Sequence, residues 1–268
     1  MSMERFVEAW TERLRREIQG AVAIILKGSH ARGSAGPWSD LDFDVLVFDE
    51  DIADRYLSRI EENDEGRLVH VSVAVESVEG WLEGFDEAAS WSFRLPSREA
   101  TRLLWLGRPS LAAELDQPFR HHPAGEPELE DFIEGLGKAR NAHRRGDELT
   151  LRLAVQDLAS LCPSLLVPLN DPLLAIPGTR PESLRAALDF AIAPAGYRDD
   201  LLLCLGLTGL PSTPDTLMAA AERLVSGTLG LLEANADRLG PLLAPELPEQ
   251  LSAGVLRRYL EQPTAQPD

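Results

Sequence analysis

The stretch GSHARGSAGPWSDLDFDVLV, from Gly28 to Val47, decides the fold of the first part of the chain. It follows the nearly continuous apolar run AVAIILK at residues 21–27, which is typical of a buried strand. Its first half is rich in Gly, Ser and Pro and predicts a loop with room for a helical turn. Residues 41–48 alternate apolar and acidic side chains before becoming wholly apolar. They predict a second strand that is exposed on one face over its first half.

Three acidic side chains of this stretch, Asp40, Asp42 and Asp44, are spaced two residues apart. They therefore share one face of the predicted strand. Carboxylates this close repel one another unless a cation lies among them. Mg²⁺ suits such a group, because it takes one or two carboxylates and completes its shell with waters and phosphate oxygens. The spacing predicts a Mg²⁺ site among these three carboxylates.

The residues before the strand carry the groups that bind a phosphate. Gly28 allows close approach of the backbone, Ser29 offers an amide and a hydroxyl, and Arg32 offers a forked donor. A phosphate cradle beside a carboxylate pair predicts a site for a nucleoside triphosphate and for phosphoryl or nucleotidyl transfer. A Gly-Ser turn or an Asp-x-Asp alone is usually structural, so it is their joint occurrence between two strands that favours this function.

The flanking sequence predicts an N-terminal α/β domain at residues 1–120. Helical spacing of apolar residues predicts helices at 3–18, 51–60 and 78–88. Alternation and β-branched residues predict strands at 67–75 and 103–106. The segment HHPAGEP at residues 121–127 is typical of a linker.

Beyond the linker, the pattern is helical and interrupted by Pro and Gly. It predicts a helical-bundle domain at 127–262, and the whole chain is therefore expected to be α+β. The expected helices span residues 127–145, 150–166, 181–193, 197–206 and 214–238.

The charge balance excludes proteins whose main role is to coat nucleic acid. Lys plus Arg number 26 and Asp plus Glu number 44, so the formal net charge is 26 − 44 = −18. Nucleic-acid binding depends on Lys and Arg that neutralise phosphates, whereas this excess of acid suits a cationic partner or a need for solubility. The first residues lack the apolar core of a signal peptide, no long apolar run predicts a membrane span, and the two cysteines are expected to be buried thiols. We expect a cytoplasmic protein.

The pattern of Gly-Ser followed by Asp-x-Asp at a strand start resembles the nucleotidyltransferase superfamily that includes DNA polymerase beta. The fuller form, GS-x-x-R-x-x-x-GPWSD-L-D, is most similar to the kanamycin nucleotidyltransferase family of aminoglycoside-modifying enzymes. Residues 134–141, EGLGKARN, and residues 194–209, PAGYRDDLLLCLGLTG, resemble segments of that family's helical domain. The resemblance implies an ATP-binding, Mg²⁺-dependent enzyme that modifies antibiotics.

The resemblance also implies roles for individual residues. Asp40 and Asp42 match the catalytic metal-binding pair, while Gly28, Ser29 and Arg32 match positions around the triphosphate. Glu134 matches the general base that deprotonates the acceptor hydroxyl, and Lys138 matches a lysine that contacts the nucleotide. Two subunits build each active site in that family, which implies a homodimer. By their spacing alone, Glu134 and Lys138 are typical of an exposed ion pair on a helix.

The third strand departs from the superfamily pattern. Many members carry another acidic residue there, but the best-matching position is the neutral Ser72. Glu76 and His70 share its face, and either one could replace the missing carboxylate. Asp44 is an additional carboxylate where the kanamycin enzymes have an apolar residue. Glu76 is also a candidate for binding the acceptor substrate.

The leading hypothesis is nucleotidyl transfer from an NTP to a hydroxyl of a small cationic acceptor such as an aminoglycoside. One alternative is nucleotidylation of a protein or an RNA end. The other is a nucleotide-binding regulatory module with little turnover, which the neutral Ser72 favours. The sequence alone leaves the acceptor and the preferred NTP open.

Overall fold

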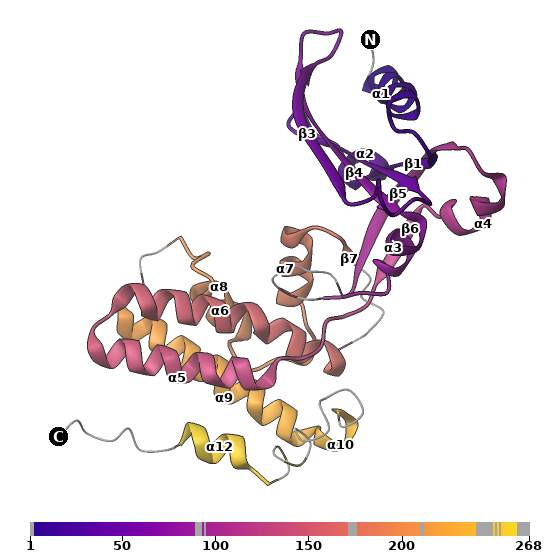
Figure 1. Ribbon diagram of the computed structural model, residues 1–268. Coiled ribbons are helices and arrows are strands. Elements are labelled where there is room, and N and C mark those ends of the chain that lie inside the picture. Colours follow the sequence, from indigo (N-terminus) through magenta and orange to yellow (C-terminus); the bar gives the residue numbers. More distant parts are fainter. Residues whose placement is uncertain are drawn as a thin grey trace. The chain divides into compact units, whose positions relative to one another are not determined.

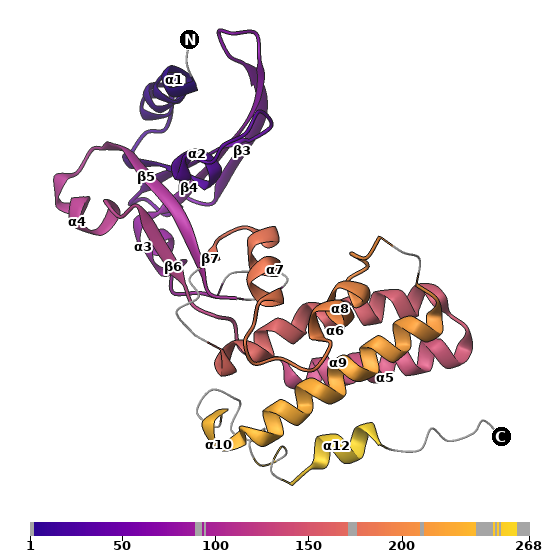
Figure 2. The ribbon, with the colours of Figure 1, turned by 180° about the vertical axis from the view of Figure 1, so that it is seen from behind.

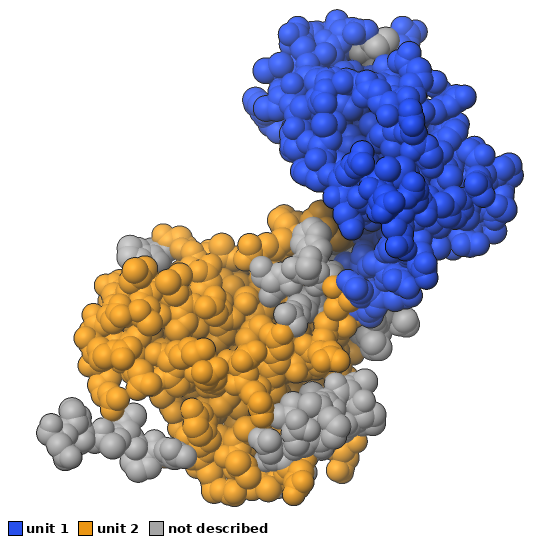
Figure 3. Space-filling model, in the orientation of Figure 1, with its two compact units in different colours: residues 1–87, 97–123 blue, residues 88–96, 124–268 orange. Residues whose placement is uncertain are grey.

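A computed structural model describes residues 3–88, 93, 95–170, 176–209, 212–239, 249, 251 and 253–261. The chain divides into two compact units, shown in different colours in Figure 3. Unit 1 is Met1–Glu87 with Ser97–Pro123, and unit 2 is Ala88–Pro96 with Ala124–Asp268. The sequence did not indicate that the short segment Ala88–Pro96 groups with the helical unit.

Unit 1 is built on a sheet with the strand order β3-β4-β2-β1-β5-β6 (Figures 1 and 2). β2 and β4 run parallel, whereas the other neighbours in this order are antiparallel. The strands are β1 (Ala21–Lys27), β2 (Leu41–Val47), β3 (Arg55–Glu62), β4 (Leu68–Ser77), β5 (Ser97–Leu106) and β6 (Phe119–His122). The helices are α1 (Met3–Glu17), α2 (Gly28–Arg32), α3 (Val78–Glu83), the 3₁₀ helix η1 (Pro109–Leu111) and α4 (Ala112–Leu115).

The two faces of this sheet differ in chemistry. On one face, the odd-numbered residues of β2 and residues 69, 71, 73 and 75 of β4 are apolar and pack against α1, whose buried side chains include Phe6, Trp10 and Leu14. The opposite face we call the acidic face. Its polar residues include Asp42 and Asp44 on β2, Ser72 and Glu76 on β4, Lys27 on β1 and Glu99 on β5. α3 and α4 cover one end of it, where Trp81 and Leu115 pack near Ile25 and Leu46.

The helix predicted at residues 51–60 is wrong. Ile52, Tyr56 and Ile60 have helical spacing, but β3 occupies Arg55–Glu62 and pairs antiparallel with β4 along its whole length. As a strand, the segment places Leu57 against the covered face of the sheet, while Tyr56 and Ile60 are exposed. Pairing with β4 thus overrides a helical pattern that buries few side chains.

Three further boundaries in unit 1 differ from the prediction. The strand predicted at 103–106 is the end of the longer β5, and the expected linker begins with the last residues of β6. The helix predicted at 78–88 ends at Glu83. The strands at 21–27, 41–48 and 67–75 correspond closely to β1, β2 and β4.

Unit 2 is helical and has a core of its own. Its elements are α5 (Leu129–Arg145), α6 (Glu148–Leu166), η2 (Val167–Leu169), β7 (Ile176–Pro177), α7 (Arg180–Leu188), α8 (Tyr197–Cys204), α9 (Pro214–Ala234), α10 (Ala236–Leu239) and α12 (Val255–Leu260). α5, α6 and α9 lie side by side in both ribbon views. Gly135 of α5 permits a close approach, because a Cβ there would lie 2.9 Å from the Cβ of Leu158 on α6. The expected α+β class is confirmed, although α7 is shorter than predicted and α12 was missed.

The most apolar helical stretch, Glu148–Leu169, is long and apolar enough to cross a membrane by length and composition. Most of it is buried among the other helices of unit 2, which is the pattern of a core helix. Cys162 and Cys204 are free and buried, as expected, and burial raises the pKa of each thiol to about 12. Thiols with such a pKa are unreactive at neutral pH.

Candidate active site

Three strands bring their polar residues together at the start of β2. Asp40 precedes the strand and is exposed, while Asp42 is its second residue and is half-buried. The neighbours of Asp42 across the sheet are Lys27 at the end of β1 and Ser72 in the middle of β4. The parallel register of β2 and β4 thus places Ser72 beside Asp42, at the position where the sequence comparison lacked a carboxylate.

The turn that follows β1 lies directly against Asp42. Gly28 has φ +69°, and a Cβ at this position would lie 3.2 Å from Oδ2 of Asp42. Glycine is required there both by the left-handed backbone and by the nearness of the carboxylate. The structure therefore brings together Gly28 and Asp42, which the sequence predicted as parts of one site.

Ser29 and Arg32 both lie on the short helix α2 and are half-buried. The carbonyl of Ser29 accepts a hydrogen bond from the backbone amide of Ser34, and Gly33 ends α2 in a left-handed conformation. Nε of Arg32 lies 3.4 Å from Oγ of Ser34. These contacts fix the backbone of the turn that carries Ser29.

The electrostatics of Asp42 fit a bound cation. Burial, followed by repulsion from Asp40, raises the pKa of Asp42; Asp44 adds to this effect and Lys27 opposes it. Two hard carboxylates that repel each other beside a Gly-Ser turn match the ligands that Mg²⁺ takes from proteins. Among the described residues there is no group of three or more His, Cys, Asp or Glu side chains that could hold a metal ion. Two carboxylates are a set that Mg²⁺ accepts, because waters and phosphate oxygens complete its shell.

Asp44 lies two residues further along β2 than Asp42 and, unlike Asp40 and Asp42, is fully buried. Only 1% of its side chain is exposed, and Oδ2 accepts hydrogen bonds from Nζ of Lys27 at 3.0 Å and from Nε1 of Trp81 at 2.7 Å. Burial raises the pKa of Asp44, while Lys27 and Trp81 lower it in part. Asp44 therefore forms a buried ion pair with Lys27 on the acidic face.

Sequence reasoning missed two residues of this face, Lys27 and Glu99. Glu99 on β5 accepts a hydrogen bond from the backbone amide of Gly28, and burial raises its pKa. The signal for Lys27 was a charged residue at the end of an apolar run, directly before Gly28. Glu99 gave no comparable signal, because it stands in the mixed sequence SREAT at residues 97–101 and the strand that carries it was predicted to begin only at residue 103.

The two candidates for replacing the third carboxylate lie in different places. Nδ1 of His70 lies 3.9 Å from Oδ2 of Asp40, and its Nε2 is 2.7 Å from Oγ of Ser58. Glu76 pairs with Leu46, further along the strand, and its charged neighbours are Asp44, Lys27 and Asp54. The structure therefore places His70 next to the carboxylate pair and Glu76 away from it.

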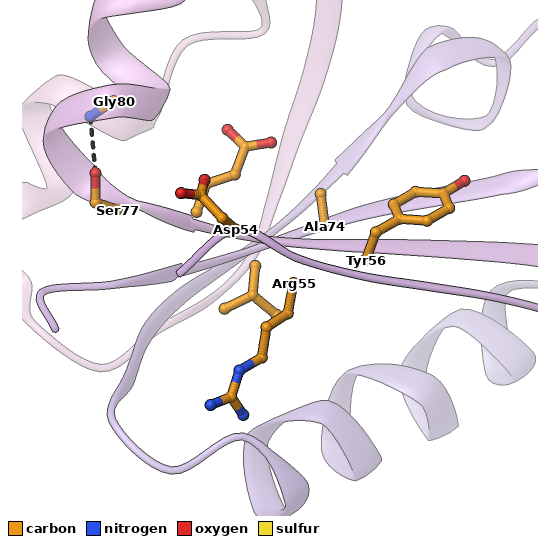
Figure 4. Close-up of a pocket in the computed structure, with 8 residues that line it drawn as sticks. Asp54, Arg55, Tyr56, Ala74, Ser77 and Gly80 are labelled. Atoms are coloured by element: carbon orange, nitrogen blue, oxygen red, sulfur yellow. Dashed lines mark hydrogen bonds between the residues drawn. The ribbon is translucent and has the colours of Figure 1, made fainter. Parts of the chain in front are cut away.

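Glu76 instead lines a cavity of about 400 Å³ between β3, β4 and the start of α3. Asp54, Tyr56, Ser77 and Gly80 also line it. Figure 4 shows Asp54 and Tyr56 on one side of the strands, with Arg55 directed to the other side, and Ser77 Oγ accepting a hydrogen bond from the amide of Gly80. Burial and the nearby Asp44 raise the pKa of Glu76. The cavity thus carries two carboxylates, a hydroxyl and an aromatic ring.

Glu134 and Lys138 belong to unit 2 and lie one turn apart on α5. Nζ of Lys138 is 3.3 Å from Oε1 of Glu134, and both side chains are more than half exposed. Within unit 2 they form the solvated pair that their spacing predicts.

Two family models match the chain, one in each half. Residues 7–90 match the model described as "Nucleotidyltransferase domain", and residues 128–234 match "Nucleotidyltransferase, substrate binding domain". Among solved structures, the chain is similar to a nucleotidyltransferase-like protein from Exiguobacterium sibiricum 255-15, at 13% identity and a TM-score of 0.42. That similarity covers 90% of this chain and 78% of the other. No curated protein matches the chain.

We predict that Asp42→Asn stabilises unit 1 at neutral pH. Because burial and neighbouring carboxylates raise the pKa of Asp42, the folded protein holds this proton more tightly than the unfolded chain does. The stability from this group is present below the ordinary pKa of Asp and is lost as the pH rises through the raised value. Without added metal, the variant should melt a few degrees above the wild type at pH 7 and at the same temperature near pH ~3.

Thermal unfolding followed by circular dichroism from acid to neutral pH checks this prediction. Asp51→Asn, which removes a carboxylate from an exposed position of a nearby loop, is the control and should leave the melting curve unchanged. A variant at position 42 that melts below the wild type at pH 7 would show that the carboxylate stabilises the fold.

Proposed function

Since the chain belongs to the nucleotidyltransferase superfamily and is kanamycin nucleotidyltransferase-like, we propose that it transfers a nucleoside monophosphate from ATP to a hydroxyl of a small cationic acceptor such as an aminoglycoside. The chain is an enzyme that combines a nucleotidyltransferase domain with an aminoglycoside-type substrate-binding domain. The observation that carries the proposal is the juxtaposition of Asp42 and the Gly28 turn on the acidic face.

In the proposed site, Asp40 and Asp42 hold Mg²⁺, and Gly28, Ser29, Arg32 and Lys138 bind the triphosphate. A bound Mg²⁺ would neutralise charge on the phosphate oxygens and on the leaving group. The side chains of α2 orient the α-phosphorus toward the acceptor, and the carboxylate of Glu134 accepts the proton of the attacking hydroxyl. The acceptor oxygen forms a bond to the α-phosphorus while the bond between the α-phosphorus and the bridging oxygen breaks. Pyrophosphate leaves with that electron pair.

The cavity lined by Glu76 supports a cationic acceptor. Two carboxylates in a partly buried cavity attract an ammonium group, and the ring of Tyr56 offers an apolar surface to a sugar. The net charge of −18 adds long-range attraction for a polycation. We therefore assign Glu76 to the binding of the acceptor rather than to catalysis.

The neutral Ser72 favours a second candidate, a regulatory module that binds a nucleotide without turnover. Ser72 is buried and its hydroxyl accepts a hydrogen bond from Tyr56 Oη at 3.0 Å, so it offers no charge to a metal ion. A protein or RNA acceptor is the other alternative within the enzyme class.

We predict that the protein releases pyrophosphate when ATP, Mg²⁺ and a panel of aminoglycosides are mixed with it. Asp40→Asn and Asp42→Asn should each lower kcat by about 10²-fold or more, because each removes a ligand of the charge-neutralising ion. A coupled pyrophosphate assay measures the rate, and mass spectrometry identifies the modified acceptor. Unchanged turnover in Asp40→Asn would exclude the proposed site, whereas nucleotide binding without turnover on any acceptor would support the regulatory module.

We predict that Glu76→Gln raises the KM for a cationic acceptor by about tenfold and leaves the KM for ATP unchanged. A hydrogen bond to a charged group contributes about 1.5–3 kcal/mol, which corresponds to tenfold or more in affinity. Steady-state kinetics with each substrate varied in turn separates the two effects. Glu79→Gln, an exposed neighbour that does not line the cavity, is the matched control. A rise in the KM for ATP instead would place Glu76 in the nucleotide site.

We further propose a homodimer in which Glu134 acts on the partner subunit's substrate. Mixing inactive Asp40→Asn with inactive Glu134→Gln protein should then restore up to about one quarter of the activity, because random pairing gives half of the molecules as heterodimers with one intact site each. Light scattering gives the oligomeric state. An active monomer, or no recovery on mixing, would contradict the shared site.

A further inference from the structure

Lys27 lies at the centre of the acidic face but has no role in the proposed transfer. It is the last residue of β1 and directly precedes Gly28 and Ser29. Nζ lies 3.0 Å from Oδ2 of Asp44, and 30% of the side chain is exposed. Trp81 holds the same oxygen of Asp44 from the other side. The ion pair with the buried carboxylate of Asp44 thus fixes the position of the ammonium group.

Four carboxylates share the charge of this ammonium group. The electrostatic influence of Lys27 lowers the pKa of Asp42, Asp44, Glu76 and Glu99, each of which burial raises. Oδ1 of Asp44 is buried and has no hydrogen-bond partner among the described residues. A positive charge at this place therefore offsets repulsion among acids contributed by three strands, β2, β4 and β5.

Fold stability alone does not account for the pair of Lys27 and Asp44. Replacing a buried ion pair with apolar residues of similar volume is often neutral or stabilising. The surroundings would accept such residues, because Ile25 and Leu46 lie nearby on the same face. Lys is also scarce in this chain: the 26 basic residues include only two lysines, at positions 27 and 138. A compact ammonium group, rather than a guanidinium, is used at this position.

Few side chains around Asp42 could serve as ligands of a metal ion. Asp40 and Asp42 are suited to one Mg²⁺, and the residue beside Asp42 on β4 is the neutral Ser72. On the other side of Asp42, across the β1–β2 ladder, is Lys27. A second divalent ion at Asp42 would thus lack a carboxylate from β4 and would be repelled by the ammonium group.

We propose that Lys27 is a positioning residue of the nucleotidyltransferase site, whose ammonium group provides the second positive charge beside Asp42, so that the site binds one divalent cation per nucleotide. This inference rests on the proposed nucleotidyl transfer at Asp40 and Asp42. Lys27 keeps its protons throughout: it exchanges none with the acceptor hydroxyl or with pyrophosphate. Its charge holds the Asp42 carboxylate and the adjacent phosphate oxygens in place.

Counting Mn²⁺ ions tests the inference independently of turnover. The full-length protein is titrated with Mn²⁺ in the presence of a non-hydrolysable ATP analogue, and free Mn²⁺ is measured by electron paramagnetic resonance. We expect one ion per bound analogue and no spectrum of two coupled ions. Two ions per analogue would overturn the inference and leave the proposed function intact. Equal binding by the wild type and Asp40→Asn would contradict the proposed function itself.

Removing the ion pair of Lys27 and Asp44 tests whether the ammonium group contributes to nucleotide binding or only to the stability of the fold. The double variant Lys27→Met with Asp44→Leu avoids an unpaired buried charge and leaves the net charge unchanged, so we expect it to fold. Its affinity for the analogue with Mn²⁺ should fall by about tenfold or more. Glu79→Gln is the control for an unrelated charge change and should bind like the wild type. A folded double variant with wild-type affinity would show that the pair is only structural.

Discussion

The two-residue period of β2 is the constraint on which the rest of unit 1 depends. Along Leu41–Asp44, apolar and acidic side chains alternate, so one face of the sheet packs against α1 while the other carries carboxylates. A shift of one residue in the pairing of β2 would place Asp42 and Asp44 under α1 and expose Phe43. The burial of Leu41, Phe43 and Val45 therefore fixes the direction in which the acids point.

The carboxylates of the acidic face are buried close to one another, although their charges repel. Burial raises the pKa of Asp42, Asp44, Glu76 and Glu99, so each carboxylate is in a place that disfavours its ionised form. Within the fold, Lys27 and Trp81 partly offset this unfavourable free energy through their contacts with Asp44. In the proposed function, a divalent cation and a cationic acceptor would offset more of this repulsion. Groups arranged for binding at the expense of stability are typical of active sites.

The Gly28 turn and the acidic strand could be predicted from sequence because one short stretch carries both. β1 precedes that stretch and β2 ends it, and the apolar residues of both strands are typical of a buried sheet. Lys27 and Glu99 could not be assigned in the same way, because their importance depends on which strands become neighbours. β5 pairs with β1 across a long sequence separation, and nothing local to Glu99 predicts that pairing.

β3 is an element that local sequence patterns predicted wrongly. Its residues have a helical spacing, and only the pairing with β4 makes the segment a strand. The consequence extends to the cavity of Glu76, because Tyr56 of β3 and Asp54, the residue directly before the strand, both line it. The cavity lined by Glu76 therefore could not be foreseen from sequence, whereas the carboxylate pair could.

We propose that Asp40 and Asp42 bind a divalent ion that faces a triphosphate on the Gly28–Ser29 turn. Crystals of the protein grown with Mn²⁺ and a non-hydrolysable ATP analogue test this arrangement through the anomalous scattering of manganese. We expect a manganese peak within bonding distance of both carboxylates, with the triphosphate against Gly28 and Ser29. A manganese peak or a triphosphate located elsewhere, with the two aspartates free of both, would contradict it.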